Sequence, residues 1–266
     1  MFANNKHDVA RAFESPNFAI RAVRENIGEV EVIATEYLAK ARPRSAMYEK
    51  KKEKLTIFSF IFDQQVPDRL RYLCATSIEM CRHALDQATC AAYQCSTGED
   101  APGKLYFPIG SDAANFRSKV RNDLPAELHS VFEPFMIFKA SEELSQRGDI
   151  ICALNKAARN KHRVYCSPIA QVGMLEMDKI IYRAGDNASA AFYFPFGKVI
   201  PESREIVLAQ VGPGGNFTSH AKYHFGMGLF NAGKFSGQGP AEALDLMLRN
   251  VSAIIEEIEA GVVGLT

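Results

Sequence analysis

Residues 67–94 read PDRLRYLCATSIEMCRHALDQATCAAYQ, the longest stretch of the chain with the pattern of a helix. Pro67 and Asp68 are typical of the first turn of a helix, where the missing N–H of proline costs nothing. Apolar and small residues then recur every three or four positions, as on one face of a helix. They are Leu70, Cys74, Ser77, Cys81, Leu85, Ala88 and Ala92. Because small side chains dominate this stripe, a neighbouring helix can approach closely. The stretch therefore predicts a long helix, about 67–94, packed against another helix.

The chain before this helix predicts a second long helix and a strand. Ser15 followed by Pro16 is typical of a helix N-cap and first helical position. An apolar stripe follows and Pro43 ends it, which predicts a helix over about 16–41. Residues 55–62 have the composition of a strand, and the charged run YEKKKEK before them predicts a solvated hairpin turn or arm. We expect the strand to be covered, since an exposed IFSFIF edge would promote aggregation.

Glycine separates a helical part of the chain from a strand-rich part. Residues 1–100 contain two glycines, whereas 173–239 contain eleven. After the loop 95–110, helices are predicted at about 112–121, at 125–133, from Ser141 to about 161, and at 240–260, where Gly261 would end the last helix. Strands are predicted at 178–183, 189–196, 204–211 and 216–225. The glycine-rich VGPGG, 211–215, is interpreted as the hairpin turn between the last two strands.

These elements together predict an α+β fold. Long N-terminal helices and a short hairpin would pack with a mainly antiparallel C-terminal sheet and a final helix. We expect one domain over 1–266, with a helical half at about 1–170, a strand-rich half at about 171–239 and the C-terminal helix at about 240–260. No repeat and no low-complexity linker interrupts this plan.

Composition and charge exclude several classes of protein. The 266 residues include 31 Lys and Arg against 31 Asp and Glu, and 47% are apolar. These values exclude a disordered chain, a collagen-like fibre and a protein that binds polyanions over its whole surface. Residues 1–17 lack the regions of a secretory signal, and no apolar run approaches the roughly 20 residues that span a bilayer. We therefore expect a cytoplasmic protein without a membrane partner.

The cysteines and histidines do not have the spacing of a redox or metal site. Three of the six cysteines, Cys74, Cys81 and Cys90, share the helix at 67–94, and no CxxC is present. We predict that all six thiols are free. His220 and His224 have a spacing that binds zinc on a helix, but four residues of a strand span about 13 Å. We predict a strand there, no metal site and no cofactor.

Two polar segments are the candidate functional site. CRHALDQA, 81–88, places Arg82 and Asp86 one helical turn apart, and NKAARNKHRVY, 155–165, places Asn155, Arg159 and His162 on one helix face. One interpretation is structural, with Asp86 tying the two helices together through the cations of the second segment, Lys161, His162 or Arg163. In the other, Asp86 orients His162 for acid–base chemistry while Arg82 and Arg159 bind an anion.

The same segments carry a resemblance to a known family. CRHALD at 81–86, YFPIG at 106–110 and ALNKAARNKHRVY at 153–165 resemble the L-R-x-A-L-D, F-P-I and N-x-x-D-K-H-R motifs of a family of bacterial proteins with no assigned activity. The resemblance covers roughly 17–170. By matching positions it implies that Arg82, Asp86, Lys161, His162 and Arg163 are site residues. The chain departs from the family at Asn160, where the motif has Asp, and at Cys81 and His83.

A second resemblance is to the HEPN ribonucleases of toxin and defence systems. Arg159-Asn160-x-His162 has the residue types of their signature, with a shorter spacing. Three hypotheses follow. In the first, the Arg82/Asp86/His162 cluster ties helices together or binds an anionic ligand. In the second, His162 acts with Arg82 or Arg159 in a metal-independent ribonuclease with RNA as partner. In the third, the hairpin at 48–62 is a protein-interaction surface, and a homo-oligomer is compatible with all three.

Overall fold

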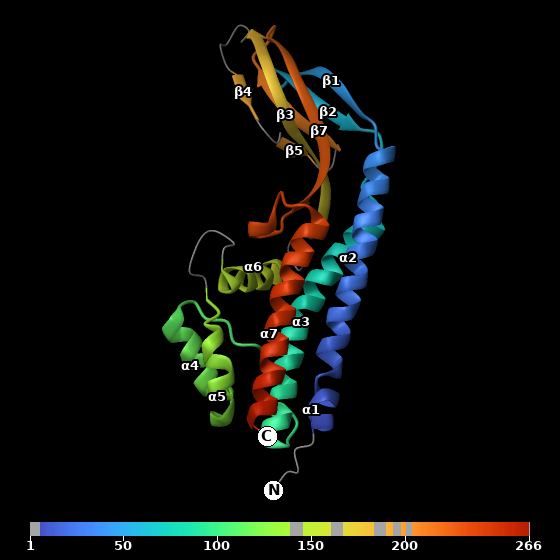
Figure 1. Cartoon of the computed structure of the whole chain (residues 1–266). Helices are drawn as coiled ribbons and strands as arrows, with labels where there is room; N and C mark the ends of the chain where they lie inside the picture. Colours follow the sequence, from blue (N-terminus) through green and yellow to red (C-terminus); the bar gives the residue numbers. More distant parts are fainter. Residues whose placement is uncertain are drawn as a thin grey trace.

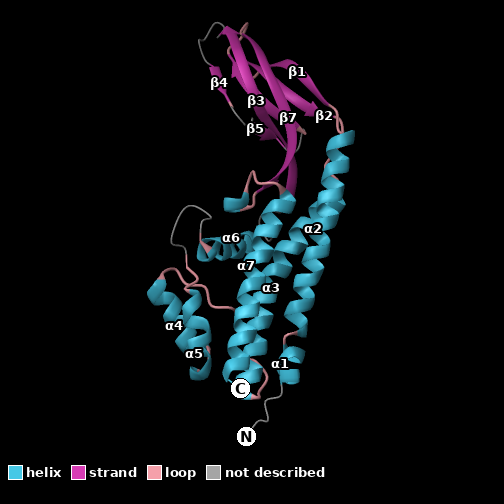
Figure 2. Cartoon of the chain, in the orientation of Figure 1, coloured by secondary structure: helices cyan, strands magenta, loops and turns pink. Residues whose placement is uncertain are grey.

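A computed structural model describes residues 6–138, 146–160, 167–183, 190–193, 198–200 and 204–265, and the side chains among these except at 6–8, 160, 167, 173–180 and 219–222. The molecule is elongated, with helices at one end and strands at the other (Figures 1 and 2). The predicted α+β class is confirmed, as are the long N-terminal helices, the antiparallel pairing and the final helix. Among the described residues no helix combines the length and the apolar character needed to cross a bilayer.

The first long helix begins earlier than predicted. A short helix, α1 (Lys6–Ala12), leads through the buried Phe13 into α2 (Glu14–Lys40), so the predicted N-cap at Ser15 is wrong and this residue lies inside α2. The hydrogen bonds from the Phe13 amide to the Val9 carbonyl (3.0 Å) and from the Asn17 amide to the Phe13 carbonyl (3.1 Å) continue the ladder through the junction. Pro16 has no N–H to donate to the carbonyl of Ala12, four residues earlier, and α1 ends at Ala12.

The hairpin that follows belongs to the large sheet. β1 (Pro43–Lys50) and β2 (Leu55–Phe62) pair antiparallel around a turn at 51–54, as the charged run predicted. β2 also pairs antiparallel with β6 (Glu205–Val211), far along the chain. The apolar IFSFIF segment therefore lies between two strands and is covered. The sheet is not built from the C-terminal strands alone, because a strand from the helical half lies in its middle.

The central helix and its neighbours follow the sequence pattern. α3 (Asp68–Thr97) ends at Gly98, which adopts a left-handed φ of 74°. α4 (Ala113–Asp123) and α5 (Ala126–Phe132), followed by the 3-10 turn η1 (Glu133–Phe135), match the two predicted short helices. α6 (Arg147–Asn160) begins at Arg147 after a bend at 146, so it is shorter than predicted, and the proposed cap Ser141 lies outside the described residues.

The C-terminal strands form two sheets rather than one. β3 (Ser167–Arg183) and β7 (Asn216–Phe230) pair antiparallel with each other and are both longer than predicted. The predicted strand at 189–196 is described only as β4 (Ala190–Phe192), which pairs with β6 as β5 (Lys198–Ile200) does. His220 and His224 lie on β7, which confirms the strand expected there.

VGPGG is a turn between sheets and not a hairpin. It connects β6 to β7, but β7 pairs with β3 while β6 pairs with β2 on one edge and with β4 and β5 on the other. Both edges of β6 are therefore occupied, and the chain leaves the sheet at 212–215. The two sheets pack through aromatic side chains: the ring of Phe60 on β2 lies 5.1 Å from that of Tyr223 and 5.0 Å from that of Phe225 on β7.

The final helix continues beyond its predicted end at Gly261. The 3-10 turn η3 (Gly233–Phe235) precedes α7 (Pro240–Leu265), which continues through Gly261. A Cβ at this position would lie 2.7 Å from Cγ1 of Val131 on α5. Gly261 therefore allows the close approach of α5, and its role is packing rather than helix termination.

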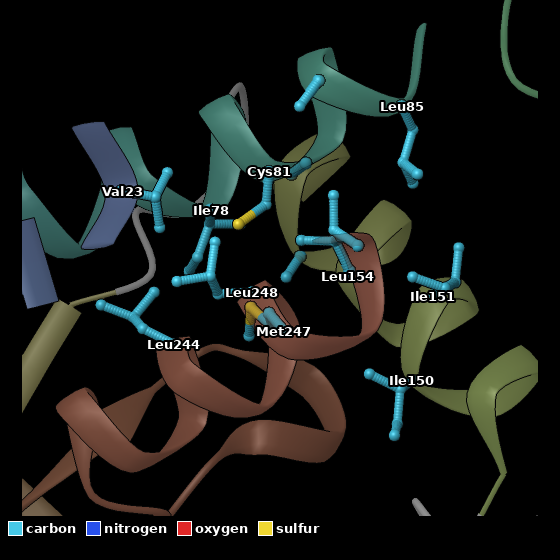
Figure 3. Packing of buried hydrophobic residues seen from close by; sticks show 14 of the residues in the cluster. Val23, Ile78, Cys81, Leu85, Ile150, Ile151, Leu154, Leu244, Met247 and Leu248 are labelled. Carbon is cyan, nitrogen blue, oxygen red and sulfur yellow. The ribbon is translucent and has the colours of Figure 1, made fainter. Parts of the chain in front are cut away.

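The main core lies where α2, α3, α6 and α7 meet, and its apolar residues continue onto β3, β6 and β7. Figure 3 shows Ile78, Cys81 and Leu85 of α3 facing residues of α6 and α7. Cys81 and Leu85 are fully buried, as the stripe at 67–94 predicted. The five cysteines that the structure describes are free thiols, as predicted, and Cys166 lies outside the described residues.

Candidate functional site

The candidate site is built around an ion pair on α3. Arg82 and Asp86 are one turn apart, and Nη1 of Arg82 donates to Oδ1 of Asp86. Their side chains are only 13% and 20% exposed. The sequence explains where the ion pair lies on α3. Cys81 and Leu85 face the core, and Arg82 and Asp86 each follow one of them, so the pair lies at the edge of the buried stripe.

Two further contacts connect this pair to other parts of the chain. Nε of Arg82 donates to Oδ1 of Asn155 on α6 over 3.0 Å. The backbone amide of Phe107 donates to Oδ1 of Asp86 over 2.8 Å. The Arg82–Asp86 pair therefore holds α3, α6 and the loop before α4 in one arrangement.

The loop before α4 has an alternating pattern that fixes its exposed side chains. Leu105 and Phe107 are 7% and 2% exposed, whereas Tyr106 between them is 58% exposed. The ring of Phe107 packs on Phe132 with centroids 6.2 Å apart. With the Phe107 amide bound to Asp86, the backbone on either side of Tyr106 is anchored, and the Tyr106 side chain faces outward.

An open cleft of about 570 Å³ lies beside these residues. Residues of α3, the loop before α4, α4 and α6 line it: Glu79, Arg82, His83, Asp86, Lys104, Tyr106, Phe107, Pro108, Ile109, Lys119, Asp123, Asn155, Ala158 and Arg159. Its volume falls within the range of roughly 300–1,000 Å³ that small-molecule sites occupy. The ion pair thus forms part of the wall of a concave and accessible surface.

The cleft lining contains more cations than the one that is paired with Asp86. Lys104, Lys119 and Arg159 line it in addition to Arg82, and Nζ of Lys119 donates to the Ile109 carbonyl over 2.6 Å. Arg159 is exposed and forms no ion pair with the described residues. Negative charge is contributed by Glu79 and Asp123 as well as Asp86. The charge of Asp86 also reaches Cys90, because burial first and then this carboxylate raise the pKa of that thiol.

The structure brings together four of the residues singled out from the sequence: Arg82 and Asp86 on α3, and Asn155 and Arg159 on α6. Lys161, His162 and Arg163 lie outside the described residues, so the proposed contact between Asp86 and these three has no described geometry. Sequence reasoning missed Lys104, Tyr106 and Lys119. The alternation of Lys104-Leu-Tyr-Phe was a usable signal for the exposed tyrosine, but nothing in the sequence placed this loop beside α6.

Within the ranges that the structure describes, no group of three His, Cys, Asp or Glu side chains has the arrangement of a metal site. Models of protein families, curated proteins and solved structures give no match to this chain. The function is therefore inferred from the cleft itself, whose polar groups are guanidinium, ammonium, imidazole, amide, carboxylate and phenol.

Proposed function

We propose that the cleft binds a small anionic ligand and that the Arg82–Asp86 pair holds its walls in place. The observation that carries this proposal is the way Arg82 is held. Asp86 and Asn155 accept from Nη1 and Nε, and Nη2 has no hydrogen-bond partner among the described residues. A guanidinium fixed by two acceptors, with donors left over, is suited to a planar or tetrahedral anion such as a carboxylate or a phosphate.

Two further cations of the cleft lining, Lys104 and Arg159, supply local attraction, although the four cations of the lining exceed its three carboxylates by only one charge. Asp86 neutralises Arg82, so an anion needs further positive charge, and Lys104 and Arg159 lie in the same lining. Both are exposed, which leaves them accessible to a ligand. Because the whole chain has a formal net charge of zero, the attraction is local to the cleft and does not extend over the surface.

Titration calorimetry with inorganic pyrophosphate as the probe tests this proposal. The Arg159→Gln and Lys104→Gln variants should each weaken binding about tenfold, the loss of one charge-assisted hydrogen bond. Lys156→Gln is the matched control, because Lys156 is an exposed cation on the same helix and does not line the cleft. No binding to the parent protein, or equal weakening by the control, would reject an anion site here.

A ribonuclease remains the second proposal, because Arg159 of the Arg-Asn-x-His segment lines the cleft. Its acid–base group would be His162. Incubation of the protein with single-stranded RNA, with His162→Ala as the comparison, decides this hypothesis. Cleavage that the variant loses would support an enzyme. Pyrophosphate binding without cleavage would leave a binding protein.

A further inference from the structure

Tyr106 is an exposed aromatic residue of the cleft that anion binding does not use. Its side chain is 58% exposed although it lies in the wall of a concave surface. Its two neighbours in the chain are buried, and the amide of Phe107 is bound to Asp86. The ring is therefore held at the cleft by a backbone that is itself anchored to the ion pair, and it presents an aromatic surface to whatever occupies the cleft.

The charged residues of the cleft are mixed in sign, and this limits the class of ligand. Lys104 and Arg159 attract an anion, whereas the exposed carboxylate of Asp123 in the same lining can only accept hydrogen bonds when ionised. Inorganic phosphate and simple carboxylate ligands have few hydrogen-bond donors to offer a carboxylate of the protein. A ligand with an anionic group at one end and hydroxyl or amino donors elsewhere satisfies both kinds of residue.

We propose that the ligand is a ribonucleotide, free or as a unit of single-stranded RNA, with its phosphate at Arg159 and Lys104 and its base stacked on Tyr106. Ribose hydroxyls and exocyclic amino groups are donors for the Asp123 carboxylate, and every base has a face that stacks on an aromatic ring. The cleft, at about 570 Å³, is in the size range of sites for molecules of this kind. This inference rests on the proposed function, since it assigns a ligand class to the same cleft.

The test compares adenosine monophosphate with ribose 5-phosphate, which has the same phosphate and sugar but no base. The parent protein should bind the nucleotide about tenfold more tightly, the effect of one stacked base. Tyr106→Ala should remove this difference, and Tyr106→Phe should keep it because the ring remains. Tyr72→Ala is the matched control, since Tyr72 is 59% exposed on α3 and lies outside the cleft.

The outcomes separate this inference from the proposal beneath it. If the two probes bind with equal affinity, and Arg159→Gln weakens the binding of both, the ribonucleotide inference is wrong and the anion site is supported. Binding of neither probe would overturn both. A difference between probes that survives Tyr106→Ala would contradict stacking on this ring. Penta-adenylate in place of the monophosphate distinguishes the two sources: tighter binding of the oligonucleotide, lost in Tyr106→Ala, assigns the site to RNA, and equal affinity assigns it to the free nucleotide.

Discussion

Asp86 accepts two hydrogen bonds on one carboxylate oxygen, from the guanidinium of Arg82 and from the backbone amide of Phe107. Replacing Asp86 with Ala would leave a half-buried cation without its counter-ion and an amide without its acceptor. Each loss costs free energy, so we expect the free energy of unfolding to fall by about 2 kcal/mol. Asp86→Asn keeps an oxygen acceptor and should lose about 1 kcal/mol or less. Urea unfolding of the three proteins measures both differences.

A carboxylate in the same cleft serves as control for this prediction. Asp123 is exposed and lines the cleft, but it does not connect elements in the described structure. Asp123→Ala should change stability by less than about 0.5 kcal/mol, as surface substitutions do. Equal stability of the Asp86→Ala protein and the parent would show that the pair does not hold the cleft walls.

Tyr48 on β1 gives a second residue-level prediction, this time for pH. Its hydroxyl lies 2.8 Å and 2.9 Å from the two carboxylate oxygens of Glu205 on β6. Burial first, and then the hydrogen bond and charge of Glu205, raise the pKa of Tyr48 to about 12. In the unfolded chain the phenol loses its proton near its ordinary pKa of about 10. The stabilisation is therefore complete below about pH 10 and is lost as the pH rises towards 12.

The measurement is urea unfolding at about pH 8 and about pH 11, below and above the ordinary pKa of tyrosine. The parent protein should lose more stability between these two conditions than Tyr48→Phe, which has no proton to release at this position. If the two proteins lose the same amount, the phenol is not held in its neutral form by the fold.

Local spacing could predict some of the site residues but not their partners. The i, i+4 spacing of Arg82 and Asp86 on one helix was visible in the sequence, and so was the shared face of Asn155 and Arg159. The acceptor role of Asp86 towards the Phe107 amide was not, because a backbone donor has no sequence signature. The proximity of Tyr106 to α6 depends on the packing of separate elements, and no periodicity encodes it.

At the scale of elements, Gly261 and Gly28 form a pair whose substitutions should have opposite signs. Both lie inside long helices, where alanine is favoured over glycine by roughly 0.5–1 kcal/mol. A Cβ at Gly28 would meet no heavy atom within 4 Å, so Gly28→Ala should stabilise the protein. A Cβ at Gly261 would lie 2.7 Å from Cγ1 of Val131, so Gly261→Ala should destabilise it by forcing α5 away.

Thermal unfolding of the two variants compares these effects, with a double variant as the check on mechanism. Val131→Ala removes the Cγ atoms that the new methyl group would meet. The loss caused by Gly261→Ala should therefore be smaller in the Val131→Ala background than in the parent. A Gly261→Ala protein as stable as Gly28→Ala would mean that α5 yields without cost, and Gly261 would then have no packing role.

Gly261 also shows how far sequence patterns can predict the elements of this fold. Periodicity located α2, α3, β2 and α7, because each buries a stripe or a face that its own residues specify. Gly261 looked like a helix stop because close packing and helix termination favour the same residue. VGPGG looked like a hairpin for a similar reason: a tight turn specifies a change of direction, but the partner of each following strand depends on which edges are already occupied.

At the scale of the whole molecule, the helical end and the strand end differ in how much of each element is buried. α3 contacts α1, α2, α5, α6 and α7, and it carries twelve buried residues. β4 and β5 have three residues each and lie on the far edge of β6, and all three residues of β4 are exposed. The pairing of β2 with β6 joins the chain before α3 to the chain after α6, so the sheet cannot form until distant segments meet.

These differences predict a gradient of amide hydrogen exchange along the molecule. Amides of α3 between Leu70 and Ala92 should exchange slowest, because their opening requires the main core to separate, and exchange there reports the global free energy of unfolding. Amides of β6 and β2 should come next, since each of these strands is paired on both sides. Amides of β4 and β5 should exchange fastest among the strands, because a three-residue edge strand opens without disturbing the core. Peptide-resolved exchange followed by mass spectrometry measures this order, and slow exchange in β4 equal to that in α3 would contradict it. In that case the strand end would open only together with the helical core, as one cooperative unit.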